Sequence, residues 1–395
     1  MKTKMIYLSV LAMFAVWTSA AQTPELAKPD GVVVAHTPKS ETKYVGSPSI
    51  AVSPSGVYVA SHDFFGKRAN INGKAVTVVY TSKDKGATWS RAATVLGQYW
   101  SNLFYIGDNL YLLGVERGHG NIVIRRSTDD GRTWTTPADE RSGLLFRGAY
   151  HTAPTPVIVA NGRIWRAFEK ADAMQHKSNF RYGPLMISAA ADADLLDASS
   201  WRMSNHITVK SSYADGECKG VLEGNAVADR DGHIVDVLRM HVWPGAVEHV
   251  LIARVSDDGA TMSFDPESDF IPFEGGSKKF SIRFDVISGR YWTLANDVMK
   301  EHAGEYPAAV RNSLVLMSSP DLRRWTKHLR VLHHPDTKLH GFQYVDWLAD
   351  GEDMVFVSRT AFDDEFGGAD NYHNANYLTF HRIENFRKYE KEIVE

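Results

Sequence analysis

Short apolar runs separated by turn-forming residues recur along most of the chain. In 49–61, for example, two apolar runs flank Pro54-Ser55-Gly56, and in 154–168 two runs flank Asn161-Gly162. Two strand-length runs joined by such a turn predict a β-hairpin. Six hairpins are expected on this basis, in the ranges 49–61, 102–115, 154–168, 222–240, 279–294 and 343–358.

A repeated turn motif recurs between these hairpins. The segments Ser82–Trp89 (SKDKGATW) and Ser127–Trp134 (STDDGRTW) share the pattern S-x-D-x-G-x-T-W. Weaker copies lie in the ranges 194–201, 255–262 and 319–325. In the copy at 255–262, Asp257 stands where the pattern has its aspartate. Asp and Ser bond nearby backbone amides in such a turn, Gly takes a conformation that other residues disfavour, and Trp packs between sheets. We therefore interpret the motif as a folding device rather than a catalytic one.

Hairpins and repeated turns at this spacing predict an all-β fold, a single β-propeller of four-stranded blades. We count six blades, and seven are possible if two have been merged. Val32–His36 is a spare N-terminal strand, which we expect to join the last blade and close the ring, so that no sheet edge is left exposed. The propeller domain is expected to span residues 22–395.

The first residues have the layout of a secretory signal peptide. Met1–Lys4 is basic, 5–17 is apolar, and Thr18–Ala21 supplies small residues before Gln22. The apolar run is shorter than the roughly 20 residues that a membrane-spanning helix needs. We therefore predict a signal peptide at 1–21 and an exported protein, periplasmic or secreted, without a membrane anchor. The single cysteine, Cys218, cannot form an internal disulfide.

The charge of the chain and the spacing of its histidines limit the classes of partner and cofactor that we expect. The 44 Lys and Arg nearly balance the 47 Asp and Glu, so no global field favours nucleic acid or an anionic membrane. An anionic partner must then be bound by a local group of basic residues rather than by the overall charge of the protein. No His pair has the spacing of a helical zinc site, and His333-His334 is an adjacent pair, so we expect neither a metal nor another cofactor. We expect a monomer.

The propeller geometry predicts which polar residues meet. The innermost strand of each blade begins at the face where the second strand ends, so both places line one mouth. Polar residues gather at these places: His62, His119, His151, Glu169, Glu223, Arg239, Lys279, Tyr344 and Arg359. Each is also compatible with a structural role, such as a cross-strand ion pair between Glu223 and Arg239. Together, however, such groups favour a site for an acidic sugar.

The repeated turns resemble the Asp boxes of sialidases and related BNR-repeat proteins, from about residue 45 to residue 330. Sialidases bind the carboxylate of the substrate with three arginines, one of them in an N-terminal Arg-Ile-Pro motif, and use a Tyr–Glu nucleophile pair with an Asp. This sequence has no Arg-Ile-Pro motif. The resemblance leaves Arg239 and Arg359 as candidates for an arginine cluster.

Other segments are similar to secreted bacterial propellers that degrade polysaccharides, among them ulvan lyases and rhamnosyl-glucuronate hydrolases. The similar segments include Tyr150–Pro154, Gly162–Glu169 and Leu222–Asn225. In the lyases, His residues and a Tyr remove the proton beside the uronate carboxylate, and an Arg neutralises that carboxylate. The resemblance implies that His151 and Arg239 match the first His and the Arg. Glu169 and Glu223 stand where the second His and the Tyr are expected.

Two glutamates on neighbouring blades, backed by Arg and Lys, favour glycoside hydrolysis. We therefore hypothesise a glycoside hydrolase that acts on an acidic glycan containing uronate or sialate. Glu169 and Glu223 are expected to be acid and base, and His151 to transfer a proton or bond the glycosidic oxygen. The expected substrate-binding residues are Arg239, Lys279, His119, Tyr213, Tyr344, Arg359 and His62.

Two alternatives stay open. One is a polysaccharide lyase that cleaves a uronate-containing chain by β-elimination, with His151 and Tyr213 as base and acid. The other is a glycan-binding propeller without catalytic activity.

Overall fold

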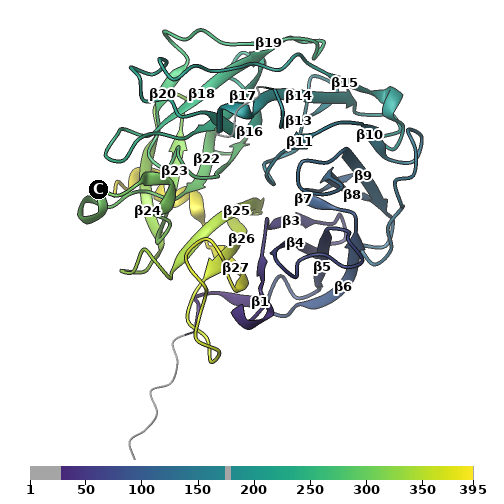
Figure 1. The fold of residues 1–395 in the computed structure, drawn as a ribbon, viewed down its shortest axis with the longest axis horizontal. Helices are drawn as coiled ribbons and strands as arrows, with labels where there is room; N and C mark the ends of the chain where they lie inside the picture. Colours follow the sequence, from purple (N-terminus) through teal and green to yellow (C-terminus); the bar gives the residue numbers. More distant parts are fainter. Residues whose placement is uncertain (1–27, 174–178, 395) are drawn as a thin grey trace, which may run out of the picture.

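Six antiparallel sheets surround a central axis (Figure 1). The structure is a computed structural model that describes residues 28–173 and 179–394. The fold is a six-bladed β-propeller, as the sequence predicts, and each expected hairpin supplies the two inner strands of one blade. The predicted signal peptide at 1–21 lies outside the described residues. None of the helices in the described ranges is long and apolar enough to cross a membrane.

Blades are numbered here in chain order, and their strands run from the axis outward. Blade 1 contains β2 (Lys43–Val45) with β3 (Ser49–Val52), then β4 (Tyr58–Gly66), β5 (Val76–Ser82) and β6 (Ser90–Leu96). Blade 2 contains β7 (Tyr99–Ile106), β8 (Asn109–Val115), β9 (Ile122–Ser127) and β10 (Leu144–Phe146). Blade 3 contains β11 (Tyr150–His151) with β12 (Ile158–Ala160), then β13 (Arg163–Lys170), β14 (Gly183–Ala190) and β15 (Trp201–Met203).

The second half of the ring repeats this plan. Blade 4 contains β16 (Val221–Ala228), β17 (Ile234–Met240), β18 (His249–Val255), and β19 (Met262–Ser263) with β20 (Phe270–Pro272). Blade 5 contains β21 (Ser281–Asp285), β22 (Arg290–Ala295), β23 (Ser313–Ser319) and β24 (Thr326–His333). Blade 6 contains β25 (Gly341–Asp350), β26 (Asp353–Ala361), β27 (Tyr377–Ile383) and β1 (Val32–His36).

The N-terminal strand closes the ring. β1 pairs with β27 as the outermost strand of blade 6, with Val32 opposite Phe380 and His36 opposite Tyr377. The two strands lie side by side at the purple and yellow ends of the chain (Figure 1). Helix is limited, within the described ranges, to short 3-10 segments: η1 (Lys39–Glu41), η2 (Asn179–Arg181), η3 (Ala198–Ser200), η4 (Lys300–His302), η5 (Pro307–Ala309) and η6 (Phe386–Lys391).

Apolar side chains fill the space between neighbouring blades. Successive residues of a strand point to opposite faces of its sheet, so each inner strand serves two interfaces. In β17, Leu238 packs in the cluster that contains Trp165 of blade 3, whereas Val237 packs in the cluster that contains Phe280 of blade 5. Burying each such side chain contributes about 1.5–3 kcal/mol. The core is therefore a series of inter-blade layers rather than one central cluster.

The repeated turns form as predicted on the face away from the mouth. In the first copy, Ser82 donates a 2.7 Å hydrogen bond to Asp84, which also accepts the Thr88 N–H at 2.9 Å. Gly86 has a φ of 91°, and a Cβ there would overlap the Phe380 ring. In the copy at 255–262 the bond joins Ser256 and Asp258 rather than residues in the register of Asp257. The Ser and Asp positions of that copy therefore lie one residue later than predicted, whereas Gly259, with a φ of 73°, stands where the glycine is expected.

Three inner strands contain a β-bulge at the same place. The pairing register shifts in β7, β16 and β25, at the end of each strand that faces the mouth. The residues at these bulges are Trp100, Glu223 and Tyr344, with φ values of 49°, 56° and 55°. Such a conformation is strained for side chains other than Gly, and it is concentrated at functional sites. Every second blade, namely blades 2, 4 and 6, thus has a β-bulge that redirects one side chain at the mouth.

Candidate active site

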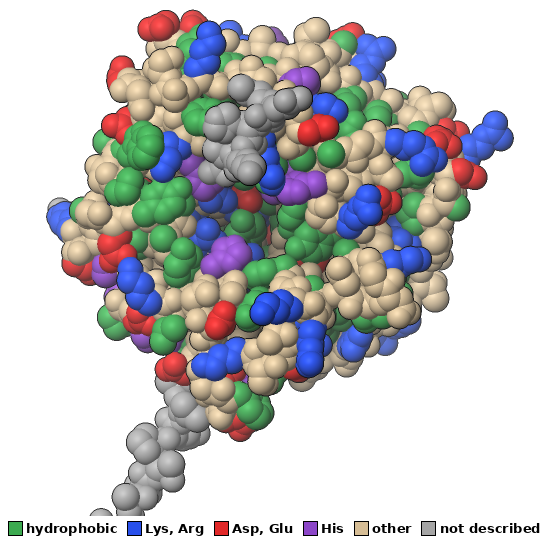
Figure 2. Space-filling view, in the orientation of Figure 1, with side chains coloured by type: hydrophobic (Ala, Val, Ile, Leu, Met, Phe, Trp, Pro, Cys, Tyr) green, Lys and Arg blue, Asp and Glu red, His purple; other side chains and the backbone are tan. Residues whose placement is uncertain are grey.

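The mouth is a polar hollow at the axis of the propeller. Viewed in the orientation of Figure 1, the surface is hollowed at its centre, where histidine and basic side chains are seen at depth (Figure 2). The predicted meeting of strand ends is observed in the pairing of β11 with β13, β16 with β17 and β25 with β26. His151 lies opposite Glu169, and Arg239 and Arg359 lie opposite the residues that precede the Glu223 and Tyr344 bulges.

Tyr344 and Glu223 form the centre of the site. The Tyr344 hydroxyl donates a 2.9 Å hydrogen bond to Oε1 of Glu223. Oε2 of Glu223 accepts a 2.5 Å bond from Nη1 of Arg239, and both side chains of this ion pair are only 4% exposed. Arg239 is itself held by a 2.9 Å bond from Nε to the Ser277 carbonyl. The expected cross-strand ion pair therefore exists, and it also bonds the tyrosine.

The charges around this pair determine its protonation. Burial would raise the pKa of Glu223, but Arg239 and then His151 lower it to about 2. Burial would lower the pKa of Arg239, but the charge of Glu223 raises it above its usual value. Burial and then the Glu223 charge raise the pKa of Tyr344. The neutral phenol thus faces an ionised carboxylate, which is the arrangement needed to pass the phenolic proton to Glu223.

Three arginines surround Tyr344. The guanidinium carbons of Arg359 and Arg311 lie 4.8 Å and 5.7 Å from the centre of its ring, and Arg239 reaches it through Glu223. Burial lowers the pKa of Arg359 to about 10 and also lowers that of Arg311. A guanidinium group is charged in proteins near neutral pH. Three cations with one carboxylate leave a local excess of positive charge. Such a cluster can bind a carboxylate through paired N–H donors.

Sequence reasoning missed Arg311. It considered only the ends of the first and second strands, whereas Arg311 precedes β23, the third strand of blade 5. Arg311 is held by a 3.0 Å bond from Nε to the Ala308 carbonyl and by a bond to Gln343. The third strand of a blade also begins on the mouth face, and including that position would have found it.

His151 and Glu169 form a second pair on blade 3. Nδ1 of His151 lies 2.8 Å from Oε2 of Glu169, whose side chain is fully buried. The other carboxylate oxygen of Glu169 accepts the backbone N–H of Glu223 at 2.6 Å. A carboxylate bound to Nδ1 fixes the orientation of an imidazole and leaves Nε2 for proton transfer. Glu169 therefore contacts both His151 and the strained backbone of Glu223.

Aromatic side chains form the wall beside His151. The His151 ring lies 4.5 Å from Trp100, edge to face, and 4.5 Å from Tyr182. His119, predicted to bind substrate, is half-buried in this wall, with Nε2 3.1 Å from the Tyr182 hydroxyl and 2.9 Å from Nη2 of Arg181. Burial, and then the charges of His151 and Arg181, lower the pKa of His119 to about 4. His119 is thus a neutral wall residue.

Two other predicted substrate-binding residues are buried. Lys279 donates bonds of 2.7 Å and 2.6 Å from Nζ to Ser281 and to the Val345 carbonyl, and burial lowers its pKa to about 7. His62 is fully buried, with Nδ1 2.8 Å from the Asp63 carbonyl, and burial lowers its pKa to about 4. Strand-end position does not determine depth, and substrate contact by either side chain stays a prediction, since Lys279 is 3% exposed, as are Arg239 and Arg359.

Tyr213 lies outside the central group. Its ring is 5.9 Å from both Phe264 and Phe270, in the apolar cluster between blades 3 and 4. None of its contacts with the described residues joins it to His151. The pairing of His151 and Tyr213 in the elimination hypothesis is therefore not supported by a contact.

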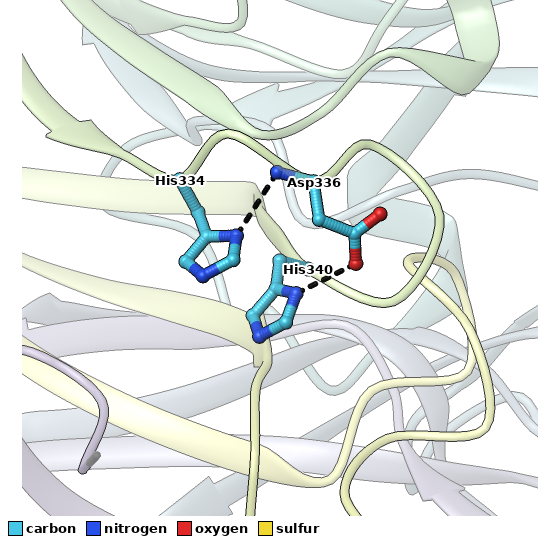
Figure 3. A group of neighbouring side chains, drawn as sticks. All are labelled: His334, Asp336 and His340. Carbon is cyan, nitrogen blue, oxygen red and sulfur yellow. Dashed lines mark hydrogen bonds and ion pairs between the residues drawn. The ribbon is translucent and has the colours of Figure 1, made fainter.

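The described residues offer two groups that could hold a metal ion. Asp229, Asp231 and His233 form one at a hairpin turn, and His334, Asp336 and His340 form the other (Figure 3). In the second group the two imidazoles stack, with ring centres 3.5 Å apart and planes inclined by 16°. Nδ1 of His340 is bound to Asp336 at 2.8 Å, and Nδ1 of His334 accepts the Asp336 N–H at 3.1 Å. In-plane lone pairs of stacked rings run parallel rather than converging on one ion, so this arrangement does not fit the tetrahedral geometry of zinc.

Comparisons with known proteins find similar folds but no similar sequence. No family model matches the sequence, and no curated protein matches it. A protein of unknown function from Dyadobacter fermentans has a TM-score of 0.58 at 15% identity, covering 92% of this chain and 100% of its own. The Penicillium chrysogenum α-L-arabinanase complexed with arabinobiose has a TM-score of 0.55 at 14% identity, covering 92% and 99%. The Hadza microbial sialidase has a TM-score of 0.59 at 13% identity, covering 92% and 69%. The chain therefore shares the overall fold of these proteins, a six-bladed β-propeller.

Proposed function

We propose that this protein is a glycoside hydrolase that acts on a glycan carrying a carboxylate. The observation that carries the proposal is the Tyr344 hydroxyl bonded to Glu223 at 2.9 Å among the guanidinium groups of three arginines. A phenol beside a carboxylate is a nucleophile with its base. The arginines supply the charge that an anionic sugar needs. This set is similar to the Tyr–Glu pair and arginine cluster that the resemblance to sialidases implies.

The reaction would proceed in two displacements. Tyr344 attacks the anomeric carbon while Glu223 accepts the phenolic proton, and the glycosidic C–O bond breaks as the leaving oxygen takes a proton from His151. Water then attacks the anomeric carbon and gives its proton to His151, while the bond from that carbon to the Tyr344 oxygen breaks and Glu223 returns the proton to Tyr344. This scheme revises the expected acid–base pair of Glu169 and Glu223, because both oxygens of the buried Glu169 carboxylate already have partners.

Known proteins of this fold support the reaction class more than the substrate. The arabinanase and the sialidase both act on glycosidic bonds, according to their names. Arabinobiose carries no carboxylate, so the shared fold alone does not favour an acidic sugar. The preference for a uronate or a sialate rests on Arg239, Arg311 and Arg359.

Elimination is the second candidate, and one observation favours it. His151 is oriented by Glu169 and lies close enough to Glu223 to lower the pKa of that carboxyl. An imidazole base facing a tyrosine and arginines could remove the proton beside a uronate carboxylate, with Tyr344 rather than Tyr213 as the acid. Hydrolysis and elimination therefore use the same residues in different roles.

One experiment separates these reactions. The protein is incubated with sialyllactose and with uronate-containing oligosaccharides, while reducing ends and near-ultraviolet absorbance are recorded. New reducing ends without absorbance support hydrolysis, and absorbance from an unsaturated product supports elimination and overturns hydrolysis. Binding without either signal indicates the glycan-binding alternative. Tyr344→Phe must abolish the signal, while Tyr389→Phe, in η6 away from the mouth, is the matched control.

We also propose that the chain is exported and that residues 1–21 are removed. The proposal rests on the basic, apolar and small-residue order of that segment. Sequencing the N-terminus of the protein recovered outside the cytoplasm tests it, and an intact Met1 there would contradict it.

A further inference from the structure

Three bulged residues occupy equivalent places in the ring, and only two of them belong to the reaction described above. Glu223 and Tyr344 are the members in blades 4 and 6, and Trp100 is the member in blade 2. Each has a positive φ, which costs free energy for a residue with a large side chain. A fold that uses this strained position twice for a reacting group is expected to use it a third time for contact with the substrate.

A buried carboxylate holds Trp100 in this conformation. Oδ2 of Asp63 accepts the backbone N–H of Trp100 at 2.7 Å, and Oδ1 accepts the backbone N–H of Ser47 at the same distance. Asp63 lies in β4, opposite Thr77 at the end of the β4–β5 pairing, and is only 2% exposed. The arrangement repeats two blades further on, where Glu169 accepts the backbone N–H of Glu223 at 2.6 Å. Asp63 therefore relates to Trp100 as Glu169 relates to Glu223.

The neighbours of Trp100 indicate which part of a substrate it would contact. Its indole is partly exposed and lies 4.5 Å from His151 and 5.5 Å from His119, both edge to face. A general acid must lie beside the oxygen of the leaving group. If His151 is that acid, a sugar next to both His151 and Trp100 is the one released, on the opposite side of the scissile bond from the sugar bound by the arginines.

From this geometry we infer that Trp100 is the stacking platform for the leaving-group sugar, and that Asp63 is the residue that positions it. The inference rests on the proposed function and deepens it. The C–H face of a pyranose ring packs on an indole, which offers a large apolar surface with a polar N–H edge. The substrate class is accordingly an oligosaccharide in which the acidic sugar is linked to at least one further pyranose, rather than a glycoside of a small alcohol.

The test compares substrates with and without a second sugar. The probes are 3′-sialyllactose and a glucuronosyl disaccharide, each paired with the corresponding glycosyl fluoride, whose leaving group occupies no sugar subsite and needs no proton. Trp100→Ala is expected to raise KM for both oligosaccharide probes, which lowers their kcat/KM by about tenfold or more. For the glycosyl fluorides, the same variant is expected to change kcat/KM by less than about twofold. Trp100→Phe should fall between Trp100→Ala and wild type. Asp63→Asn should show the same selective loss.

A control and a binding measurement keep the two proposals separate. Phe284→Ala removes a 42% exposed aromatic from the hairpin at the far face and should leave both substrates unaffected. Binding of the same oligosaccharides is measured by calorimetry in the Tyr344→Phe background, which does not require turnover. If Trp100→Ala weakens oligosaccharide binding, the result supports Trp100 as the stacking platform. If the wild-type protein also cleaves none of the substrates, that second result overturns the proposed hydrolase function and leaves the platform standing. Equal losses on oligosaccharide and fluoride, or unchanged oligosaccharide binding, overturn the platform.

Discussion

The hydroxyl of Tyr344 lies 2.9 Å from a carboxylate oxygen of Glu223, although 121 residues separate them in the chain. Each residue sits at a β-bulge of an inner strand, with φ values of 55° and 56°. The two strands belong to blades 6 and 4, so the contact exists only in the closed ring. The proposed nucleophile and its base are therefore products of the whole fold rather than of any one blade.

The phenolic oxygen of Tyr344 is the first point at which the mechanism can be tested. Tyr344→Phe keeps the ring between Arg359 and Arg311 but removes the attacking atom, so kcat should fall by about a thousandfold or more while the melting temperature stays close to wild type. Glu223→Gln should give a similar loss of kcat. Steady-state kinetics with a thermal melt measures both. Activity of Tyr344→Phe within tenfold of wild type would exclude the phenol as nucleophile.

Glu169 is predicted to act through His151 rather than on the substrate. Glu169→Gln retains a side chain of the same shape but removes the charge that stabilises a protonated imidazole, so kcat should fall about a hundredfold for glycosides with poor leaving groups. Aryl glycosides whose leaving groups differ in acidity provide the measurement. The loss should shrink as the leaving group becomes more acidic, because such a group departs without a proton. A uniform loss across the series would indicate a purely structural role.

Asp236 is predicted to make stability depend on pH. Neither of its buried oxygens has a hydrogen-bond partner among the described residues, and burial, followed by the charge of Glu169, raises its pKa well above 3.8. The unfolded chain ionises near 3.8, so this residue lowers stability progressively as pH rises from there through the folded pKa. Asp236→Asn should therefore raise the melting temperature at pH 8 by about 2 °C or more and change it little at pH 4.

The exposed Asp108 supplies the control for this experiment, since Asp108→Asn should have no effect on melting at either pH. A gain from Asp236→Asn that is equal at pH 4 and pH 8 would show that ionisation of Asp236 is not the cause.

The repeated turns are predicted to affect stability without affecting catalysis. Asp129 accepts bonds of 2.8 Å from the Ser127 hydroxyl and of 2.9 Å and 2.7 Å from the N–H and hydroxyl of Thr133. Asp129→Ala should lower the free energy of unfolding by about 1–3 kcal/mol. Because this turn is on the face away from the mouth, kcat should not change. Denaturant unfolding with Arg132→Ala, an exposed neighbour, as control tests the prediction, and a large change in kcat would contradict it.

The fold could be predicted because its signals are local. Each hairpin is specified by apolar runs around a short turn, and the repeated motif is complete within eight residues, as in Ser82–Trp89. Neither depends on contacts with distant parts of the chain. The ring of six blades then follows from repetition, and the pairing of Val32–His36 with the last blade follows from the need to cover its edge.

The site could be predicted only in part. Counting strand ends selected Glu223, Arg239, Tyr344 and Arg359, which the structure brings together. It gave no depth, so the bond that Lys279 donates to the Val345 carbonyl was not predicted. It also gave no role to Trp100, because a β-bulge, which redirects a side chain by one position, has no signature in the apolar pattern. The bond between Tyr344 and Glu223 was also hidden, because it depends on how far two blades are rotated about the axis.

The closure of blade 6 by β1 has a consequence for how the protein is made. β1 precedes every other strand of the propeller along the chain, and its partner β27 follows every other one, so β1 is synthesised before the blades that separate the two strands and β27 after them. Tyr344 and Arg359 stand on the two inner strands of that same blade. Blade 6 therefore cannot close until synthesis has passed Ile383, however early the other blades fold. We expect a chain truncated before residue 377 to lack the closing strand pair and, with it, the support that holds Tyr344 and Arg359 at the mouth.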